Sequence, residues 1–515
     1  MERAAAGLRI ALGLALAAAG YLLENHVVPR LSDHRGHLLL AHDDRVTVAL
    51  PRRPRRALVV VVDGLTAVDA RGLASVRRLA ARGRCVLTDV GLPSVSRPVY
   101  ATLSSGVEQA RTGVRNNDDT SPAPVDSLWE RAHDAGLRVS YRSELPWWGQ
   151  LFPRGFDRAV VGRAADDLLA APVTDDLTLV HPVYVDDLSH DHGRDSPEVR
   201  AALRRLDGEL AHALDRLDPA LDLVALTADH GHRAAGGHGG ASPEVTRVLT
   251  CFAGPGVRRG EGAPLFDVRD VAPTLAVLLG VPFPHHAATR RDPRPMLDAV
   301  VDRNAVGRGY FDARLEGLAR IRRRAADELA ARARRPNATW ADLDELALRP
   351  RRLRALLAAA LSALVVTVTL RRALPCGDRL AALAWALAVT ALFVAVYGVV
   401  AGGLDATSIN GRGLFTRNVL AAVATALALG ALWHRQRGGS WRALAGRAWG
   451  LTALAACANA AHVAAYGWPL GYPLPGPFLY FAPFLLGALL CAAGAAAAGF
   501  EARALTDRSA PRPPP

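Results

Sequence analysis

The sequence contains no lysine, no CxxC pair and few aromatic residues. Arginine alone therefore supplies the positive charge behind the formal net charge of +13. The arginines are spread along the chain and are not interleaved with aromatic side chains, so the sequence lacks the footprint of a nucleic-acid-binding protein. The five cysteines have no spacing typical of a cysteine zinc site. Cys85 and Cys251 could pair in an oxidising compartment, and the sequence leaves that pairing open.

Long apolar runs lie near both ends of the chain, and they consist mainly of Ala, Leu and Val. The run at 8–23 follows Arg3 and has the form of a signal peptide or a signal anchor. Small residues at 15–19 would permit cleavage, and we favour an uncleaved anchor over residues 1–25. The C-terminal part has five further apolar stretches of about 20 residues each, the length that spans a bilayer: 353–370, 380–402, 417–434, 449–467 and 475–500.

These stretches predict a five-helix membrane domain over residues 351–500, preceded by a charged helical connector at 305–350. The loops at 371–379 and 434–449 are rich in arginine, and the positive-inside rule places them in the cytoplasm. We therefore expect an integral protein of the plasma (inner) membrane. Residues 26–350, with the catalytic domain at 26–304, would lie outside the cytoplasm, and the tail, 501–515, would lie inside.

Residues 26–304 alternate short apolar, strand-like runs with helical runs. This alternation is typical of an α/β domain, with a mainly parallel sheet sandwiched by helices. The predicted fold class is therefore an α/β catalytic domain joined to an α-helical membrane domain with several spans.

Acids and histidines follow three of the apolar runs, ALVVVVDG, LTLVHPVYVDDLSHDHG and LVALTADHGH, and one more histidine lies in GGHGG. In an open α/β sheet, ligands bind where parallel strands end. Six of these side chains are candidate metal ligands: Asp63, Asp186, His190, Asp229, His230 and His238. Three more nearby residues are interpreted as residues that surround the ligands or as loop residues, and not as ligands: Asp187, Asp191 and His192.

The six candidates can form two neighbouring sites. Asp63, Asp229 and His230 would hold one divalent ion, and the other three would hold a second. Carboxylates and imidazoles suit zinc, and two adjacent metals can clamp one phosphoryl group. The predicted cofactors are therefore two divalent metal ions, with zinc as the favoured identity.

Ser96, in PSVSRPVYATLSSG, is the candidate nucleophile, and Ser94 is its main rival. Pro98 suits the first turn of a helix, which would place Ser96 at a helix N-terminus. Unpaired amides there favour an anion, either a serine alkoxide or a bound phosphate. Contact with the first metal would activate the hydroxyl, so Ser96 is also a candidate ligand. We interpret the neighbouring Arg97 as a solvent-facing residue.

Together these motifs resemble the alkaline phosphatase superfamily, and especially its nucleotide pyrophosphatase/phosphodiesterase branch. The resemblance covers about residues 57–285 and implies that Ser96 is the nucleophile, that Asn117 binds phosphate, with Asn116 as the alternative, and that the two metal sites are those above. Ser189 replaces the usual glycine of the DxxGH motif, and Val99 replaces an asparagine that is usual in nucleotide pyrophosphatases. The layout of the whole chain also resembles the membrane ethanolamine-phosphate transferases of glycolipid-anchor synthesis.

The resemblance implies a membrane-anchored phosphodiesterase or phosphotransferase that acts through a phospho-serine on a lipid-linked or envelope-glycan phosphodiester. A phosphoethanolamine-type head-group transferase is one alternative, and a non-catalytic transporter or scaffold with a phosphatase-like binding domain is another. A sulfatase is disfavoured, because the segment from Ser94 to Pro98 does not fit the sulfatase signature. Nothing in the sequence predicts the oligomeric state.

Overall fold

The computed structural model describes residues 2–22, 44–114, 117, 120–162, 168–260, 262, 264–343, 345–346, a few between 353 and 364, 378–400, 412–466 and 477–509. The chain divides into two compact units, and each is considered by itself. One unit contains the mixed α/β region within residues 33–346. The other contains the apolar helices from the two ends of the chain.

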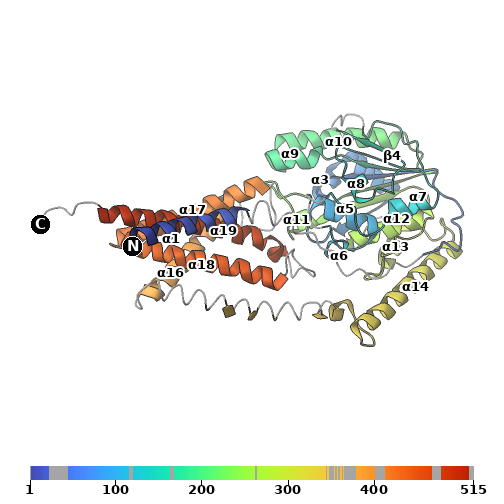
Figure 1. Ribbon diagram of the computed structural model, residues 1–515. Helices are drawn as coiled ribbons and strands as arrows, with labels where there is room; N and C mark the ends of the chain where they lie inside the picture. Colours follow the sequence, from blue (N-terminus) through green and yellow to red (C-terminus); the bar gives the residue numbers. More distant parts are fainter. Residues whose placement is uncertain are drawn as a thin grey trace. The chain divides into compact units, whose positions relative to one another are not determined.

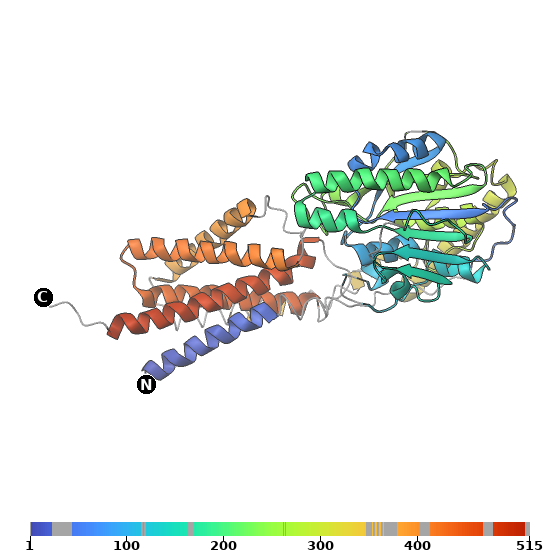
Figure 2. The same cartoon turned by 90° about the horizontal axis from the view of Figure 1, so that it is seen from above.

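The α/β unit is built on one sheet with the strand order β4-β3-β5-β1-β6-β7-β2-β8. Its strands lie side by side in one twisted layer (Figure 2). All described strand pairs are parallel except those that β7 makes with β6 and β2. The strands are β1 (Arg56–Val62), β2 (Gly83–Asp89), β3 (Val139–Ser143), β4 (Arg158–Val161), β5 (Leu177–His181), β6 (Asp222–Ala228), β7 (Arg247–Ala253) and β8 (Phe266–Asp267).

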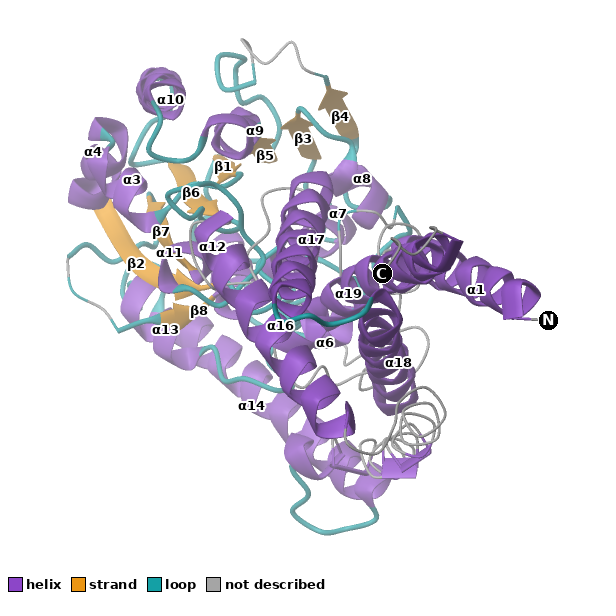
Figure 3. Ribbon diagram, turned by 90° about the vertical axis from the view of Figure 1, so that its left-hand side faces the viewer, coloured by secondary structure: helices purple, strands orange, loops and turns teal. Residues whose placement is uncertain are grey.

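Helices cover both faces of this sheet (Figures 1 and 3). One group packs α4 against α3 and α10, and α10 against α9. The other packs α5 against α7, α8 and α12. The helices of the unit are α3 (Ala67–Gly72), α4 (Ala74–Arg82), α5 (Ser96–Ser105), α6 (Gln109–Thr112), α7 (Leu128–Asp134), α8 (Trp147–Leu151), α9 (Tyr184–His192), α10 (Pro197–Asp215), α11 (Pro243–Thr246), α12 (Val271–Leu279), α13 (Arg294–Val300), α14 (Arg308–Ala333) and the 3-10 helix η3 (Val268–Asp270).

The central strands explain why the sheet needs cover on both faces. In β1, every residue from Ala57 to Val62 is buried, and all seven residues of β6 are buried. A continuous apolar run of this kind cannot face water on either side, so it forms a strand in the interior of a parallel sheet. The architecture is the mainly parallel, helix-sandwiched α/β sheet that the alternating pattern predicts.

Helix α14 lies in the region that the sequence predicts as a connector. Its residues Tyr310, Phe311 and Ile321 are buried in the same core as the central strands. The Tyr310 hydroxyl donates to the carbonyl of Val277 in α12 at 2.7 Å. The first turns of α14 therefore belong to the sheet unit. One of its arginines, Arg314, is also buried there and pairs with Asp44 at 3.1 Å.

Cys85 and Cys251 form a disulfide between β2 and β7. They face each other directly in the antiparallel register of these two strands, with their Cα atoms 4.0 Å apart. The structure thus contains the disulfide that the sequence permits but does not decide.

The second unit is helical. Its described helices are α1 (Glu2–Leu22), α16 (Asp378–Val400), α17 (Arg412–Gln436), α18 (Trp441–Tyr466) and α19 (Pro477–Ser509). Among the described residues, three segments are long and apolar enough to cross a membrane: Arg3–Leu22, Leu380–Val400 and Leu485–Asp507. The span predicted at 353–370 lies almost entirely outside the described residues.

Helix α1 packs closely along α19. A Cβ atom added to Gly13 would lie 2.9 Å from the carbonyl oxygen of Gly494, and one added to Gly20 would lie 2.5 Å from that of Gly487. Small residues at such contacts let two membrane helices approach closely. Arg9 Nε also donates to Glu501 Oε1 at 2.8 Å. The N-terminal helix is thus an integral part of the helical unit.

We therefore expect the N-terminal helix to remain in the mature protein. Mass spectrometry of the purified full-length chain should recover peptides from residues 2–22, and a mature chain that begins after Leu22 would contradict this. Gly20→Leu should lower the thermal stability of the detergent-solubilised protein because its side chain would collide with α19. Gly7→Leu is the matched control, because a Cβ atom at Gly7 meets nothing within 4 Å.

Candidate functional site

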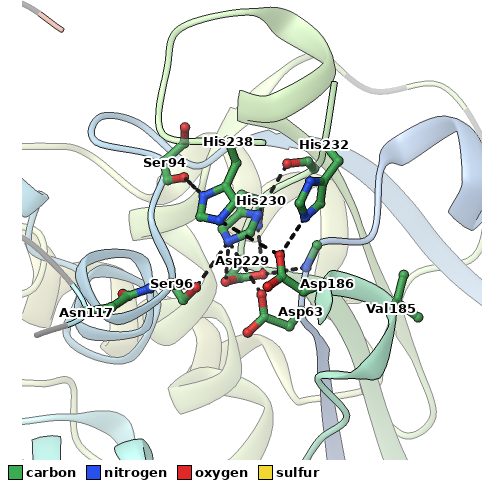
Figure 4. A network of polar contacts seen from close by, with 12 residues as sticks. Asp63, Ser94, Ser96, Asn117, Val185, Asp186, Asp229, His230, His232 and His238 are labelled. Carbon is green, nitrogen blue, oxygen red and sulfur yellow. Dashed lines mark hydrogen bonds and ion pairs between the residues drawn. The ribbon is translucent and has the colours of Figure 1, made fainter. Parts of the chain in front are cut away.

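The site begins where two paired strands end together. Val62, the last residue of β1, is in register with Ala228, the last residue of β6. The next residues are Asp63 on one strand and Asp229 on the other, so their carboxylates emerge side by side at one edge of the sheet. Both are buried, as is the adjacent His230 (Figure 4). The parallel register therefore brings two buried carboxyl groups together.

Ser96 meets these residues from the N-terminus of α5. Its Oγ lies 3.2 Å from His230 Nε2. Asn117 lies on the other side of the serine, with its Nδ2 3.4 Å from Ser96 Oγ, while its Oδ1 accepts from the amide of Arg97 at 3.0 Å. The positive end of the α5 dipole lies at this position and favours an anion. The Arg97 amide is bonded to Asn117, and the Val99 amide donates to the carbonyl of Val95. The structure thus brings Ser96 and Asn117 together beside the strand ends.

Three further predicted ligands gather next to the first group. Asp186 and His190 lie one turn apart on α9, with Asp186 Oδ2 3.4 Å from His190 Nε2. His238 comes from the glycine-rich loop after β6, and its Nε2 lies 3.1 Å from His190 Nε2 and 3.9 Å from Asp186 Oδ1. The rings of His230 and His238 stack with their centroids 3.7 Å apart, so the two groups of ligands are contiguous.

The alternatives that the sequence raised lie elsewhere or make other contacts. Ser94 Oγ donates to the carbonyl of Gly240 at 2.8 Å and accepts from the amide of Gly239 at 3.1 Å, so it holds the loop that carries His238. Asn116 lies outside the described residues. Three residues that the sequence does not favour as ligands lie on helix α9 and are exposed: Asp187, Asp191 and His192.

Arg97 is buried, contrary to the solvent-facing interpretation. Its Nη1 donates to Gln150 Oε1 at 2.9 Å, and its guanidinium lies 5.8 Å from the centre of the Trp147 ring. The side chain is covered because α5 packs against α8, which carries both partners. Arg97 therefore lies in the contact between α5 and α8, next to the serine, and not on the surface.

Several acceptor atoms at the site face one another without a hydrogen between them. His230 Nδ1 faces the carbonyl of Gly231 at 3.3 Å, and a carbonyl can only accept, so the ring carries its proton there. The Nε2 lone pair then points at Asp229 Oδ2, 3.1 Å away, and at Asp63 Oδ1, 3.4 Å away. Within the described part of the chain, these two carboxylate oxygens are buried and accept no hydrogen bond. A bound cation would offset this excess of negative charge.

Burial and the closeness of these groups also shift their pKa values. Burial, together with the carboxylates of Asp63 and Asp186, raises the pKa of Asp229 well above its usual value. Burial and the neighbouring imidazoles lower the pKa of His230 well below its usual value and that of His238 to about 4. Neutral imidazoles are the form that binds metals, and a bound cation would offset the repulsion that keeps a proton on Asp229. The buried cluster of aspartates and histidines could therefore hold a metal.

Sequence reasoning missed three buried residues at this site. His232 lies two residues beyond His230, and its Nε2 is 2.6 Å from Asp186 Oδ1. Tyr100 lies one helical turn after Ser96, and its hydroxyl donates to Asp63 Oδ2 at 2.5 Å. His181 is the last residue of β5, so the strand-end argument that selected Asp63 would also have found it. For Tyr100, the sequence offers only its spacing of four residues from Ser96, which places both residues on one face of a helix but does not predict the contact with Asp63.

Tyr100 is part of a chain of hydrogen bonds that ends on Asp63. Ser143 Oγ lies 2.8 Å from His181 Nδ1, and His181 Nε2 lies 2.9 Å from the Tyr100 hydroxyl. Burial and the charge of Asp63 raise the pKa of Tyr100 well above its usual value, so the hydroxyl keeps its proton. The chain holds one oxygen of Asp63 in place and leaves the other facing His230.

Tyr100→Phe should weaken zinc binding by about 10- to 100-fold, because hydrogen bonds of this kind orient metal ligands. Competition between the full-length protein and a zinc chelator would measure the change. Tyr310→Phe is the matched control, because it removes a buried tyrosine hydrogen bond away from the site and should leave zinc affinity unchanged. Equal affinities for Tyr100→Phe and the wild type would contradict this role.

A family model described as type I phosphodiesterase / nucleotide pyrophosphatase matches residues 126–239. This segment contains every candidate ligand except Asp63 and Ser96. A solved structure of murine ectonucleotide pyrophosphatase/phosphodiesterase 5 aligns with a TM-score of 0.40 at 15% identity, over 48% of this chain and 100% of that one.

Several curated proteins are similar in sequence. The catalytic subunit of GPI ethanolamine phosphate transferase 3 of Mus musculus is 27% identical over 222 residues, which is 39% of this chain and 20% of that protein. The catalytic subunit of GPI ethanolamine phosphate transferase 2 of Homo sapiens is 27% identical over 223 residues, with 37% and 22% covered. The chain thus matches about a fifth of the length of these relatives. The chain resembles the nucleotide pyrophosphatase/phosphodiesterase branch of the alkaline phosphatase superfamily and the membrane ethanolamine-phosphate transferases.

Proposed function

We propose that this protein is a membrane-anchored, metal-dependent enzyme that transfers a phosphoryl group from a phosphodiester through a phospho-serine at Ser96. The observation that carries the proposal is the convergence of Ser96 Oγ with the unprotonated Nε2 of His230 and two buried carboxylate oxygens without hydrogen bonds. A purely structural cluster would have no reason to bury carboxylate oxygens without hydrogen-bond partners beside a serine.

We assign the ligands to two sites. Asp63, Asp229, His230 and Ser96 would hold one divalent ion, and the second would be held by Asp186, His190 and His238. A donor set of imidazoles and carboxylates suits zinc. The two ions, when bound, would neutralise charge that develops on the phosphoryl oxygens and on the serine.

The residues of the chain then have separate tasks. Ser96 Oγ attacks phosphorus in line and forms the phospho-serine as the bond to the departing alkoxide breaks. The serine hydroxyl proton passes to solvent, and the departing alkoxide takes up a proton from solvent. Asn117 donates its Nδ2 hydrogens to a phosphoryl oxygen and is itself held by the Arg97 amide. In the second step, an incoming oxygen attacks phosphorus and the bond to Ser96 breaks.

The identity of the incoming oxygen separates two candidate functions. If water attacks, the protein is a phosphodiesterase. If an acceptor hydroxyl attacks, it is a head-group transferase, which the names of its GPI ethanolamine phosphate transferase relatives favour. We infer a lipid-linked or envelope phosphodiester as substrate, because apolar helices would tether the site to a membrane.

We further propose that the catalytic region faces an oxidising compartment outside the cytoplasm. The disulfide between Cys85 and Cys251 supports this placement, because such bonds persist in oxidising compartments. Residues 1–25 would then be an uncleaved anchor, 351–500 a membrane domain and 501–515 a cytoplasmic tail.

Hydrolysis of bis-p-nitrophenyl phosphate and of p-nitrophenyl phosphate by the zinc-loaded full-length protein in detergent tests the proposal. We expect the diester to be preferred, and Ser96→Ala should lower turnover by at least about 1000-fold. Removal of metal by a chelator should abolish turnover, and zinc should restore it. Ser104→Ala is the matched control, since Ser104 is a buried serine on the same helix whose Oγ accepts from Trp129 Nε1.

The other outcomes are also informative. A preference for the monoester would indicate a phosphatase. No turnover of either ester by a protein that binds zinc would favour a transferase that needs its membrane acceptor. Full turnover by Ser96→Ala would overturn the serine mechanism, and a protein that neither binds metal nor turns over ester would favour the non-catalytic binding module.

A further inference from the structure

His232 differs from the other histidines of the cluster in how its ring is held. Its Nδ1 accepts a hydrogen bond from the amide of Gly237 at 3.0 Å. An amide N–H can only donate, so Nδ1 carries a lone pair and the neutral ring has its proton on Nε2. That Nε2 is 2.6 Å from Asp186 Oδ1 and therefore donates to it.

The two neighbouring histidines have the opposite arrangement. His238 Nδ1 lies 3.0 Å from the carbonyl of Ser94, and His230 Nδ1 lies 3.3 Å from the carbonyl of Gly231. Both carbonyls require a proton on Nδ1, which leaves Nε2 as a lone pair directed into the cluster. The main chain therefore prepares these two rings to bind a metal and prepares His232 to donate a hydrogen bond.

The fold also makes room for this one contact. A Cβ atom on Gly64 would lie 2.9 Å from His232 Cδ2 and 3.0 Å from Asp186 Oδ1. Gly64 has φ +72°, and Gly237, which supplies the amide, has φ +92°. Such backbone conformations are accessible mainly to glycine. Two glycines thus permit the buried pair of His232 and Asp186.

We propose that His232 is a positioning residue for the metal ligand Asp186 and is not itself a ligand. By donating Nε2–H to Oδ1, His232 fixes the carboxylate plane and leaves Oδ2 turned toward His190, 3.4 Å away. A hydrogen bond from an imidazole to a carboxylate is of the strong, charge-assisted kind. This inference rests on the proposed metal site. From its position in the cluster alone, His232 would be taken for a metal ligand.

The test is zinc binding by the full-length protein, measured both as the number of ions bound at saturation and as affinity against a chelator. His232→Ala should bind as many zinc ions as the wild type, with the affinity of one of them lowered by about 10- to 100-fold. His232→Gln should recover much of that affinity, because its amide can still donate to Asp186. His238→Ala, which removes a proposed ligand, should instead bind one ion fewer.

The visible absorption of a cobalt-loaded sample gives a second measurement, because the absorption bands depend on which residues bind the metal. The visible absorption of cobalt-loaded His232→Ala should keep the wild-type band pattern, whereas that of His238→Ala should change. The inference is overturned if His232→Ala binds one ion fewer at saturation, or if its zinc affinity equals that of the wild type. A wild-type protein that binds no zinc would overturn the proposed function as well, so the two failures are distinguishable.

Discussion

The register between β1 and β6 is the constraint on which the site depends. Because Val62 pairs with Ala228, the next residue on each strand is an aspartate at the same edge of the sheet. Two buried carboxylates this close repel each other unless a proton or a cation lies between them. A slip of one residue would turn Asp63 or Asp229 to the other face. The long apolar strands that fix this register therefore also fix the chemistry.

The main chain around this charge decides what each histidine can do. The carbonyls of Ser94 and Gly231 and the amide of Gly237 determine which ring nitrogen carries the proton in His238, His230 and His232. These groups come from the segment before α5 and from the glycine-rich loop after β6. That loop is held in turn by Ser94, whose Oγ contacts Gly239 and Gly240. The rival nucleophile thus has a structural task in the same site.

Much of the fold could be predicted because strand ends and helix starts have local signals. The run before Asp63 predicted a buried parallel strand, and Pro98 predicted that a helix would begin near Ser96; both are present. The contact of Tyr100 with Asp63, the burial of Arg97 and the packing of α14 could not be predicted, because they depend on how distant elements meet. The role of His232 depends on the amide of Gly237, five residues away. Neither composition nor spacing predicts in which direction that N–H points. The assignments of nucleophile, ligands and zinc stay predictions.

Under the proposed mechanism, hydrolase and transferase share every step until the phospho-serine is attacked. The aspartates and histidines are common to both, so they cannot decide which oxygen arrives. In an in-line displacement, the incoming oxygen approaches phosphorus opposite Ser96 Oγ, where the first leaving oxygen departed. The groups that bind the rest of the incoming molecule there select between water and an organic acceptor. Arg97 is fully buried and donates to Gln150, so it supports the segment that carries the serine and offers no surface to an acceptor. The choice between the two functions therefore depends on how an acceptor is bound opposite Ser96, because the serine and the proposed metal ligands would act in the same way in both.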